Sequence, residues 1–467
     1  MTAVRRPLLP WVVWGVSVLA YAIAVVNRSS LAALGPEAQQ HFGIDATTLS
    51  AFAVMQLLVY AGMQIPVGVL LDRFGPTIML LSGGVLMMLG QLAMATAHDV
   101  WLAILARVLV GAGDACTFIS VMRLLPDWFS VRQLPIVGQL TGLIGQAGQL
   151  VSVVPLALAV SSYGWTAGFV GVAAIGLLVT LLSALVLRDW PGQGTAFERL
   201  IGRSGRLSRD ATSLGVSDST AALAAVEPPA TGLLPLAASP SRRVPGLGFF
   251  RRTRRLLSVP GVRLAYWVHF ATPFSATMLV LLWGTPFFIG GLGLNQAQAG
   301  GLLSLMIVSG MVSSLVLGPI SSRFAKSRVW IAIGVTVLCI VNWVLVLLWP
   351  GTPPIWLIAV LMIVVSIGGP TSMIAFEVAR THTPRSFAGF GTGLVNTGGF
   401  TSALLAILFV GLALDWQGAG SPEHYSLDAF RWAFATLFPI LLLGLVCMMV
   451  ELRRTQRWMR ENGRTMG

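Results

Sequence analysis

Two ionisable residues stand in a long apolar stretch of the sequence and are the first candidates for chemistry. Arg107 and Asp114 lie seven positions apart in the segment 106–118, ARVLVGAGDACTF. Seven residues make about two helical turns, so both side chains lie on one face of a helix whose other faces carry Val, Leu, Ala and Gly. A charge at membrane depth costs roughly 3 kcal/mol or more and persists mainly where it pairs or lines a water-filled path. We therefore expect function in this segment.

A guanidinium and a carboxylate at membrane depth are suited to anion binding and proton transfer. The guanidinium is always charged, and its planar fork fits a carboxylate or a phosphate. Burial disfavours the charged form of a carboxyl group and a nearby guanidinium favours it, so the protonation of Asp114 can depend on what occupies a cavity beside it. Such a dependence couples proton movement to anion movement. The alternative is a structural ion pair, in which Arg28 or Arg107 holds Asp114 and fixes two helices in register.

The composition places these charges inside a membrane protein. Of the 467 residues, 55% are hydrophobic and only 10% are charged, whereas about a quarter of residues are charged in soluble domains. Apolar runs of about twenty residues recur along the chain, and each is long enough to cross a hydrocarbon core of about 30 Å as a helix. Backbone groups in lipid must satisfy their own hydrogen bonds, so the expected fold is an all-α membrane protein.

The apolar runs predict about twelve transmembrane helices in two pseudo-symmetric halves of six. The N-terminal half occupies residues 1–190, and the C-terminal half with a basic cytoplasmic tail occupies 261–467. Residues 191–260 between them, rich in Gly, Ser, Ala, Pro and Arg, form a cytoplasmic linker that we expect to be largely disordered. The predicted spans are 11–34, 47–71, 77–97, 100–125, 135–160, 165–187, 262–290, 297–321, 329–349, 354–379, 387–414 and 429–452.

The distribution of arginine sets the expected orientation. The net charge is +13, but the basic residues gather in short loops between apolar runs, which indicates membrane topology and not nucleic-acid binding. With most of these loops on the inside, both termini are expected to be cytoplasmic. The segment 249–257, FFRRTRRLL, either lies on the inner leaflet through basic and apolar contacts or is an ordinary positive flank of the seventh span.

Two short sequences recur in the two halves at nearly the same spacing. Residues 68–75, GVLLDRFG, are followed 250 positions later by 318–324, GPISSRF, and Thr141-Gly-Leu has a counterpart in Thr392-Gly-Leu. A recurrence of this kind indicates a duplicated unit of six spans. An internal repeat in a membrane bundle places the substrate site between the halves, near the bilayer midplane.

At these motifs the sequence resembles the major facilitator superfamily, whose members are secondary transporters with two six-helix halves. The segment GVLLDRFG is similar to the family signature G-x-x-x-D-R-x-G, although the basic residues that usually follow it are missing here. The resemblance implies a role in cytoplasmic gating for Gly68, Asp72, Arg73 and Gly75. The segment 107–113, RVLVGAG, is similar to the R-x-x-x-G motif of the fourth helix.

Within the superfamily, the nearest pattern is the organic anion:cation symporter branch. Residues 27–31, NRSSL, look like its D-R-x-x-L motif, and residues 113–118, GDACTF, look like its G-E-x-x-x-F motif. The resemblance implies that Arg28 contacts an anionic substrate and that Asp114, with Arg107 on the same helix, serves proton coupling. An asparagine opens the first segment where the branch has an aspartate, which leaves one carboxylate instead of two.

Four further polar residues are candidates for substrate contacts in the same cavity. Tyr60 belongs to a series of polar residues that recurs every four positions in the second span, and Gln146 belongs to a polar face of the fifth. In the second half, the candidates are His269 in the seventh span and Asn396 in the eleventh. The alternative for the histidine is a packing residue that is held by a hydrogen bond.

The combined prediction is a secondary active transporter of a small organic anion that works by alternating access with proton symport. We expect a monomeric, multi-pass protein of the plasma membrane whose partners are substrate, proton and lipid bilayer. The alternatives are a proton-coupled multidrug or metabolite exporter, for which the fifth span lacks the expected Gly-Pro pair, and a transporter-fold membrane sensor. The sequence contains no recognisable nucleophile and base pair, metal-ligand cluster or cofactor motif, so we expect no enzyme activity, no metal and no cofactor.

Overall fold

The computed structural model describes residues 8–30, 34, 38, 41–43, 46–151, 156–200, 249–419 and 424–462. Within these ranges, every regular element is a helix. Eleven of the described helical runs are long and apolar enough to cross a membrane. The expected all-α membrane architecture is therefore confirmed.

The first half contains the first six predicted spans. Its helices are α1 (Leu9–Ser29), α3 (Ala46–Phe74), α4 (Pro76–Ala95), α5 (Val100–Trp128), α6 (Leu134–Val151), α7 (Ala157–Tyr163) and α8 (Trp165–Val186). Their bounds agree with the predicted spans to within a few residues. The fifth predicted span corresponds to α6 followed by α7, and residues 152–155 between them lie outside the described part of the chain.

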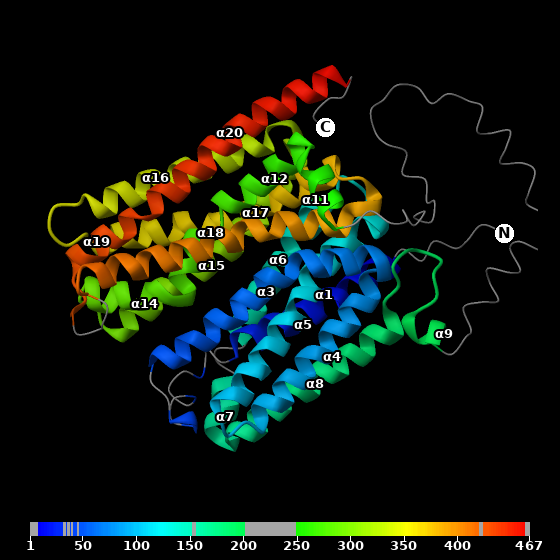
Figure 1. Ribbon diagram of the computed structural model, residues 1–467, viewed down its shortest axis with the longest axis horizontal. Helices are drawn as coiled ribbons and strands as arrows, with labels where there is room; N and C mark the ends of the chain where they lie inside the picture. The colour runs from blue at the N-terminus through cyan, green and yellow to red at the C-terminus, as the bar shows by residue number, and fades with distance from the viewer. Residues whose placement is uncertain are drawn as a thin grey trace, which may run out of the picture.

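The second half contains the remaining six predicted spans. Its α-helices are α12 (Pro260–Ala271), α13 (Phe274–Met278), α14 (Gly284–Pro286), α15 (Gln296–Arg323), α16 (Arg328–Leu347), α17 (Ile355–His382), α18 (Ala388–Trp416), α19 (Leu427–Ala435) and α20 (Leu437–Glu461). Two π-helical segments, Leu279–Trp283 and Phe287–Gly291, interrupt the seventh span, and short 3-10 turns, Ala325–Ser327 and Arg385–Phe387, precede α16 and α18. Figure 1 shows the two halves as separate groups of long helices.

The predicted linker has a short helix at each of its ends. These are α9 (Ala196–Leu200) and α11 (Phe249–Leu257). The expectation of disorder falls mostly on residues 201–248, which lie outside the described residues. α11 packs where α3 ends and α18 begins, and this end of the bundle is called the α11 end below.

The two halves meet along two helix pairs, α3 with α18 and α6 with α15. These are the second span with the eleventh and the fifth with the eighth, so the two pairs are equivalent under the twofold relation of the repeat. The repeated glycines lie in both seams. A Cβ on Gly68 would lie 2.9 Å from the carbonyl oxygen of Gly389, and one on Gly318 would lie 3.4 Å from the side chain of Gln139. Residues without a side chain thus let the halves approach closely.

Candidate functional site

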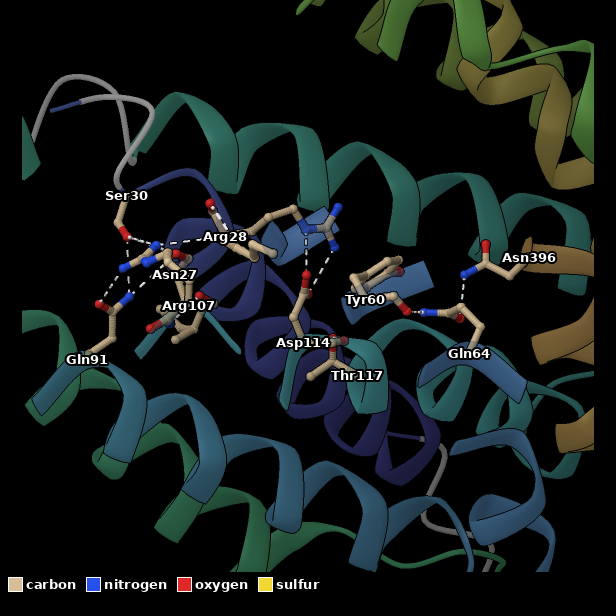
Figure 2. Close-up of polar contacts among 12 residues, drawn as sticks. Asn27, Arg28, Ser30, Tyr60, Gln64, Gln91, Arg107, Asp114, Thr117 and Asn396 are labelled. Atoms are coloured by element: carbon tan, nitrogen blue, oxygen red, sulfur yellow. Dashed lines mark hydrogen bonds and ion pairs between the residues drawn. The ribbon is translucent and has the colours of Figure 1, made fainter. Parts of the chain in front are cut away.

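The predicted anion anchor and the predicted proton carrier lie side by side in the first half (Figure 2). Arg28, in the last turn of α1, donates from Nε to Oδ2 of Asp114 at 2.6 Å and from Nη2 to Oδ1 at 2.9 Å. Asp114 is fully buried, whereas 30% of the Arg28 side chain is exposed. A guanidinium joined to a carboxylate by two bonds fixes the orientation of both groups. The carboxylate is therefore enclosed, while the guanidinium stays accessible on one side.

Glycines of α5 explain how an aspartate comes to lie at the centre of the first half. A Cβ on Gly113 would lie 2.6 Å from the carbonyl oxygen of Gly83 in α4, and one on Gly111 would lie 2.9 Å from that of Gln56 in α3. Both neighbouring helices therefore pack against the backbone of α5, which only glycine permits at such distances. Asp114 follows directly after Gly113 and is buried by this close packing.

Arg107 lies in a neutral polar shell and not against a carboxylate, as far as the described residues show. Its side chain is fully buried, and its Nε has no hydrogen-bond partner within the described part. Its terminal nitrogens donate over 3.4 to 3.5 Å to three neutral oxygens, those of Ser30, Gln56 and Gln91. Figure 2 shows this shell apart from the Arg28–Asp114 pair. Of the two arginines considered as partners of Asp114, the structure selects Arg28.

Tyr60 connects the ion pair to the second half. The guanidinium carbon of Arg28 lies 4.8 Å from the centre of the Tyr60 ring, which is the range of a cation–π contact. The same ring packs edge-on against Phe400 of α18, with ring centroids 4.6 Å apart. Tyr60 is buried, so a single aromatic side chain touches both the charged pair and the opposite half.

The two candidates for substrate contact in the second half, Asn396 and His269, are held by hydrogen bonds near the boundary between the halves. Asn396 donates to Oε1 of Gln64 on α3 at 2.7 Å, and both side chains are buried. His269 accepts at Nδ1 from the backbone N–H of Gly399 at 2.9 Å and packs edge-on against Phe376 at 5.0 Å. That bond places the proton of the neutral imidazole on Nε2. The bond from Gly399 and the contact with Phe376 hold the imidazole ring in one orientation beside α17 and α18.

Gln146 lies in the second seam between the halves. Its Oε1 faces Gly310 of α15, and a Cβ placed on Gly310 would lie 3.2 Å from this oxygen. This oxygen is buried and has no hydrogen-bond partner among the residues that the structure describes. Closer to the α11 end, Gln139 of the same helix donates to the carbonyl oxygen of Pro370 at 2.7 Å. A buried amide oxygen without a partner is unusual, and it offers an acceptor to a ligand hydroxyl.

The predicted gating residues lie at the α11 end. Asp72 accepts from the backbone N–H groups of Gly389 and Phe390 at 2.7 and 2.9 Å. These N–H groups belong to the first turn of α18, where they have no partner within the helix and favour a negative charge. Gly75 connects α3 to α4 with a φ of 86°, a conformation that suits glycine. Arg73 is exposed beside it.

Several partners of the site residues carry no signal in the sequence. Asp189, which follows α8, accepts from the N–H of Thr77 at 2.8 Å and so binds the first turn of α4. The backbone groups that face Asp72 are independent of side-chain type. Ser30 and Gln91, which surround Arg107, are isolated neutral residues in apolar helices. Of the three residues around Arg107, only Gln56 was marked by its spacing, because it stands four positions before Tyr60 in the polar series of the second span.

The described residues contain no group of three or more His, Cys, Asp or Glu placed to bind a metal ion. The three cysteines are free thiols, with Cys116 and Cys339 buried. The Sγ of Cys116 donates to the carbonyl oxygen of Ala112 at 3.4 Å, one turn back along α5. These thiols therefore behave as small packing residues.

Two halves of membrane-spanning helices, with polar side chains at their boundary and an ion pair in the first half beside it, are the architecture of a multi-pass membrane transporter. A family model described as Major Facilitator Superfamily matches residues 17–407 and 265–465. The chain therefore belongs to this superfamily, and the resemblance seen in its motifs is confirmed. It is accordingly a multi-pass protein of the cell membrane.

Similar proteins include transporters with organic acids in their names. The probable galactarate/D-glucarate transporter GudP of Pseudomonas putida is 23% identical over 443 residues, which are 91% of this chain and 90% of that protein. The probable sulfoacetate transporter SauU of Cupriavidus necator is 25% identical over 38% of this chain, and the probable L-galactonate transporter of Escherichia coli is 29% identical over 35%. These two matches span only 41% and 37% of the relatives' lengths.

The fold also matches solved structures. The proton:xylose symporter XylE, solved with bound 6-bromo-6-deoxy-D-glucose, superposes with a TM-score of 0.65 at 12% sequence identity. The superposition covers 94% of this chain and 95% of that one. At this level of identity, the likeness concerns the fold alone.

Proposed function

We propose that this protein is a secondary active transporter that moves a small organic anion by alternating access, with a proton as the coupled ion. It works as a monomer in the plasma membrane, with both termini in the cytoplasm. The observation that carries the proposal is the pair of a partly exposed Arg28 and a fully buried Asp114, joined by two hydrogen bonds. A substrate carboxylate and Asp114 compete for the same guanidinium.

The competition explains why proton and anion move together. Protonation of Asp114 removes the negative charge that holds Arg28, and the guanidinium then binds the carboxylate of the substrate. The empty site contains one positive and one negative charge, and the loaded site contains Arg28, the anionic substrate and a neutral acid. For a substrate with one negative charge, both states are therefore neutral overall, whereas either ligand alone leaves an unbalanced charge in a buried site, which is strongly unfavourable. The expected stoichiometry is one proton for each substrate molecule, because Asp114 holds a single proton.

The contacts between the halves support alternating access. Along α3, residues spaced by one helical turn meet α18 in sequence: Asp72, Gly68, Gln64 and Tyr60. These contacts close the α11 end, which we assign to the cytoplasmic side from the distribution of arginine. The ion pair lies beside the last of them, so an anion approaches Arg28 from the opposite side. Opening of the α11 end has to break the same series of contacts.

The proposed substrate is a small organic acid in its anionic form. The named substrates of the similar proteins, galactarate, D-glucarate, L-galactonate and sulfoacetate, are all anions, as the Arg28 fork requires. Sugar acids also carry hydroxyl groups. Tyr60, Gln146, His269 and Asn396 are the proposed partners for them, and the unpaired Oε1 of Gln146 is a ready acceptor.

Two measurements test the proposal. The purified protein is first screened for thermal stabilisation by these four acids, by sugar phosphates and by cationic drugs, and we expect stabilisation by an acid. Stabilisation confined to the cations would contradict the proposal and favour an exporter. The best acid is then used in proteoliposomes with an imposed pH gradient.

The second measurement compares the wild type with Asp114→Asn. The wild type should accumulate the acid when the outside is acidic. The variant has a neutral residue that cannot exchange a proton, so it should lose gradient-driven accumulation and retain exchange of labelled for unlabelled acid. Unchanged pH dependence in Asp114→Asn would remove the residue from the proton path.

A further inference from the structure

α11 is a helix with a basic face at the boundary of the membrane. Its nine residues, FFRRTRRLL, include four arginines. Only Ser258 and Val259 separate it from Pro260, where the span Pro260–Gly291 begins. Three residue steps reach at most about 11 Å. α11 therefore lies at the level of the lipid headgroups.

One side of α11 is seated between the two halves. Leu256 is fully buried in an apolar cluster with Phe387, Phe390 and Leu394 at the start of α18, and Val69 of α3 packs against this cluster. The backbone N–H of Phe390 also donates one of the two hydrogen bonds that Asp72 of α3 accepts. The seat of α11 is thus part of the closed seam at this end.

The other side of α11 carries exposed positive charge. Arg251, Arg254 and Arg255 are exposed, and none of them forms an ion pair with a described acidic residue. A shallow hollow beside them is lined by Thr253, Arg254, Leu257 and Ser258. The hollow thus combines the guanidinium of Arg254 with Leu257, a large apolar side chain that is 39% exposed.

We propose that this face of α11 binds the phosphate headgroups of anionic phospholipids in the leaflet at the α11 end. The guanidinium groups donate hydrogen bonds to phosphate oxygens, and Leu257 contacts the apolar part of the lipid. A free phosphate ion in an open, shallow hollow would keep most of its water and gain little. A lipid phosphate is already held at this depth by the bilayer.

Lipid bound here stabilises closure of the α11 end. Leu256 shares its cluster with residues of both halves, so the halves cannot separate at this end without exposing that cluster. A lipid that holds α11 in its seat therefore favours the closed seam. This coupling to the transport cycle rests on the proposed function, whereas the lipid binding does not.

The test uses the full-length protein in neutral detergent, titrated with phosphatidylglycerol, phosphatidylcholine or inorganic phosphate, with bound lipid counted by native mass spectrometry. Arg251→Gln/Arg254→Gln removes two charges and keeps good helix formers. The matched control, Arg453→Gln/Arg457→Gln, removes two exposed charges from the end of α20, which projects beyond the neighbouring helices in Figure 1.

We expect the wild type and the control to bind phosphatidylglycerol alike and in preference to phosphatidylcholine. The α11 variant should bind it about 30-fold more weakly, at roughly five-fold for each arginine near an anionic headgroup. Equal weakening in the control would mean general attraction to a basic surface. Binding of inorganic phosphate as strong as that of the lipid would mean a soluble-anion site. Either result overturns the proposal.

The coupling is measured separately with spin labels at Arg132 and Lys326, exposed residues of opposite halves at the α11 end. Phosphatidylglycerol should shift the distance distribution toward the short, closed state. Leu256→Ala should bind lipid as the wild type does and lose this shift. A shift that survives in Leu256→Ala would overturn the coupling. Both readouts work without any transported substrate, so failure here is distinguishable from failure of the proposed function.

Discussion

The two halves bury their charges at different depths. In the first half, Asp114 is the middle residue of α5, and its partner Arg28 is partly exposed. In the second half, Arg328 donates to Glu377 at 2.5 Å close to the α11 end, and the two side chains are only 11% and 6% exposed. These two pairs therefore differ in access, since the guanidinium of the first is open on one side and the second pair is enclosed.

This difference indicates a division of roles between the halves. An enclosed pair with a further bond from Ser321 to the Glu377 carboxylate has no surface for a ligand and joins α15, α16 and α17. In the second half, the predicted contacts beside the central boundary are neutral, namely His269 and Asn396. We therefore propose that Arg28 and Asp114 recognise charge, and that the Arg328–Glu377 pair has a structural role.

The strongest way to break this comparison is to remove the accessible guanidinium. Arg28→Ala should weaken binding of the stabilising acid by on the order of 100-fold, since the variant loses the only charged partner proposed for the substrate. Isothermal calorimetry on the purified variant measures this. Arg28→Lys keeps the charge without the planar fork, so its affinity for the acid should lie between those of the wild type and Arg28→Ala. Unchanged affinity in Arg28→Ala would end its role as anchor.

Breaking the enclosed pair should affect stability and not recognition. Glu377→Gln leaves the buried Arg328 without a counter-charge, which costs about 3 kcal/mol or more and should lower the melting temperature strongly. Arg328→Met/Glu377→Leu removes both charges and should recover most of that loss. Substrate affinity in the double variant should equal that of the wild type. Loss of affinity in a stable double variant would contradict the division of roles.

The hydrogen bond across the boundary sharpens the comparison at a smaller scale. Gln64→Ala and Asn396→Ala should each destabilise the closed seam, and the two effects should not add, because they remove the same bond. The expected coupling is about 1 kcal/mol, measured as a double-mutant cycle of unfolding free energies in detergent. Additive effects would show that the two side chains do not depend on each other.

The smallest effect is expected from the linker between the halves. Replacing residues 205–240 with a Gly/Ser sequence of equal length leaves α9 and α11 intact. Flexible chains of this kind preserve reach without specific contacts, so the rate of transport in proteoliposomes should stay unchanged. A large loss of transport would show that this sequence has a binding partner, as the sensor alternative requires.

Much of the fold was predictable because each span must be long and apolar enough to cross lipid. The predicted spans and the observed helices agree closely, and the recurring glycines at Gly68 and Gly318 mark the seams between the halves. The pairing of Asp114 with Arg28 rather than with Arg107 was expected from the resemblance to the symporter branch, but helical spacing alone could not decide it. It depends on how α1 packs against α5, and a period along one helix carries no information about its neighbour.

Three of the described side chains that form bonds between the halves have a backbone group as their partner. Asp72, Gln139 and Ser322 each bind a backbone group of the opposite half, with Ser322 donating to the carbonyl oxygen of Arg132 at 3.0 Å. A backbone C=O is present whatever residue occupies the position, and a backbone N–H is present at every residue except proline. Substitution of Arg132 therefore leaves its bond available, whereas substitution of Ser322 deletes the same bond. In a saturation mutagenesis map, Ser322 should therefore be more restricted than Arg132, whereas Gly389 should be restricted as well, because a Cβ there would lie 2.8 Å from Oδ1 of Asp72.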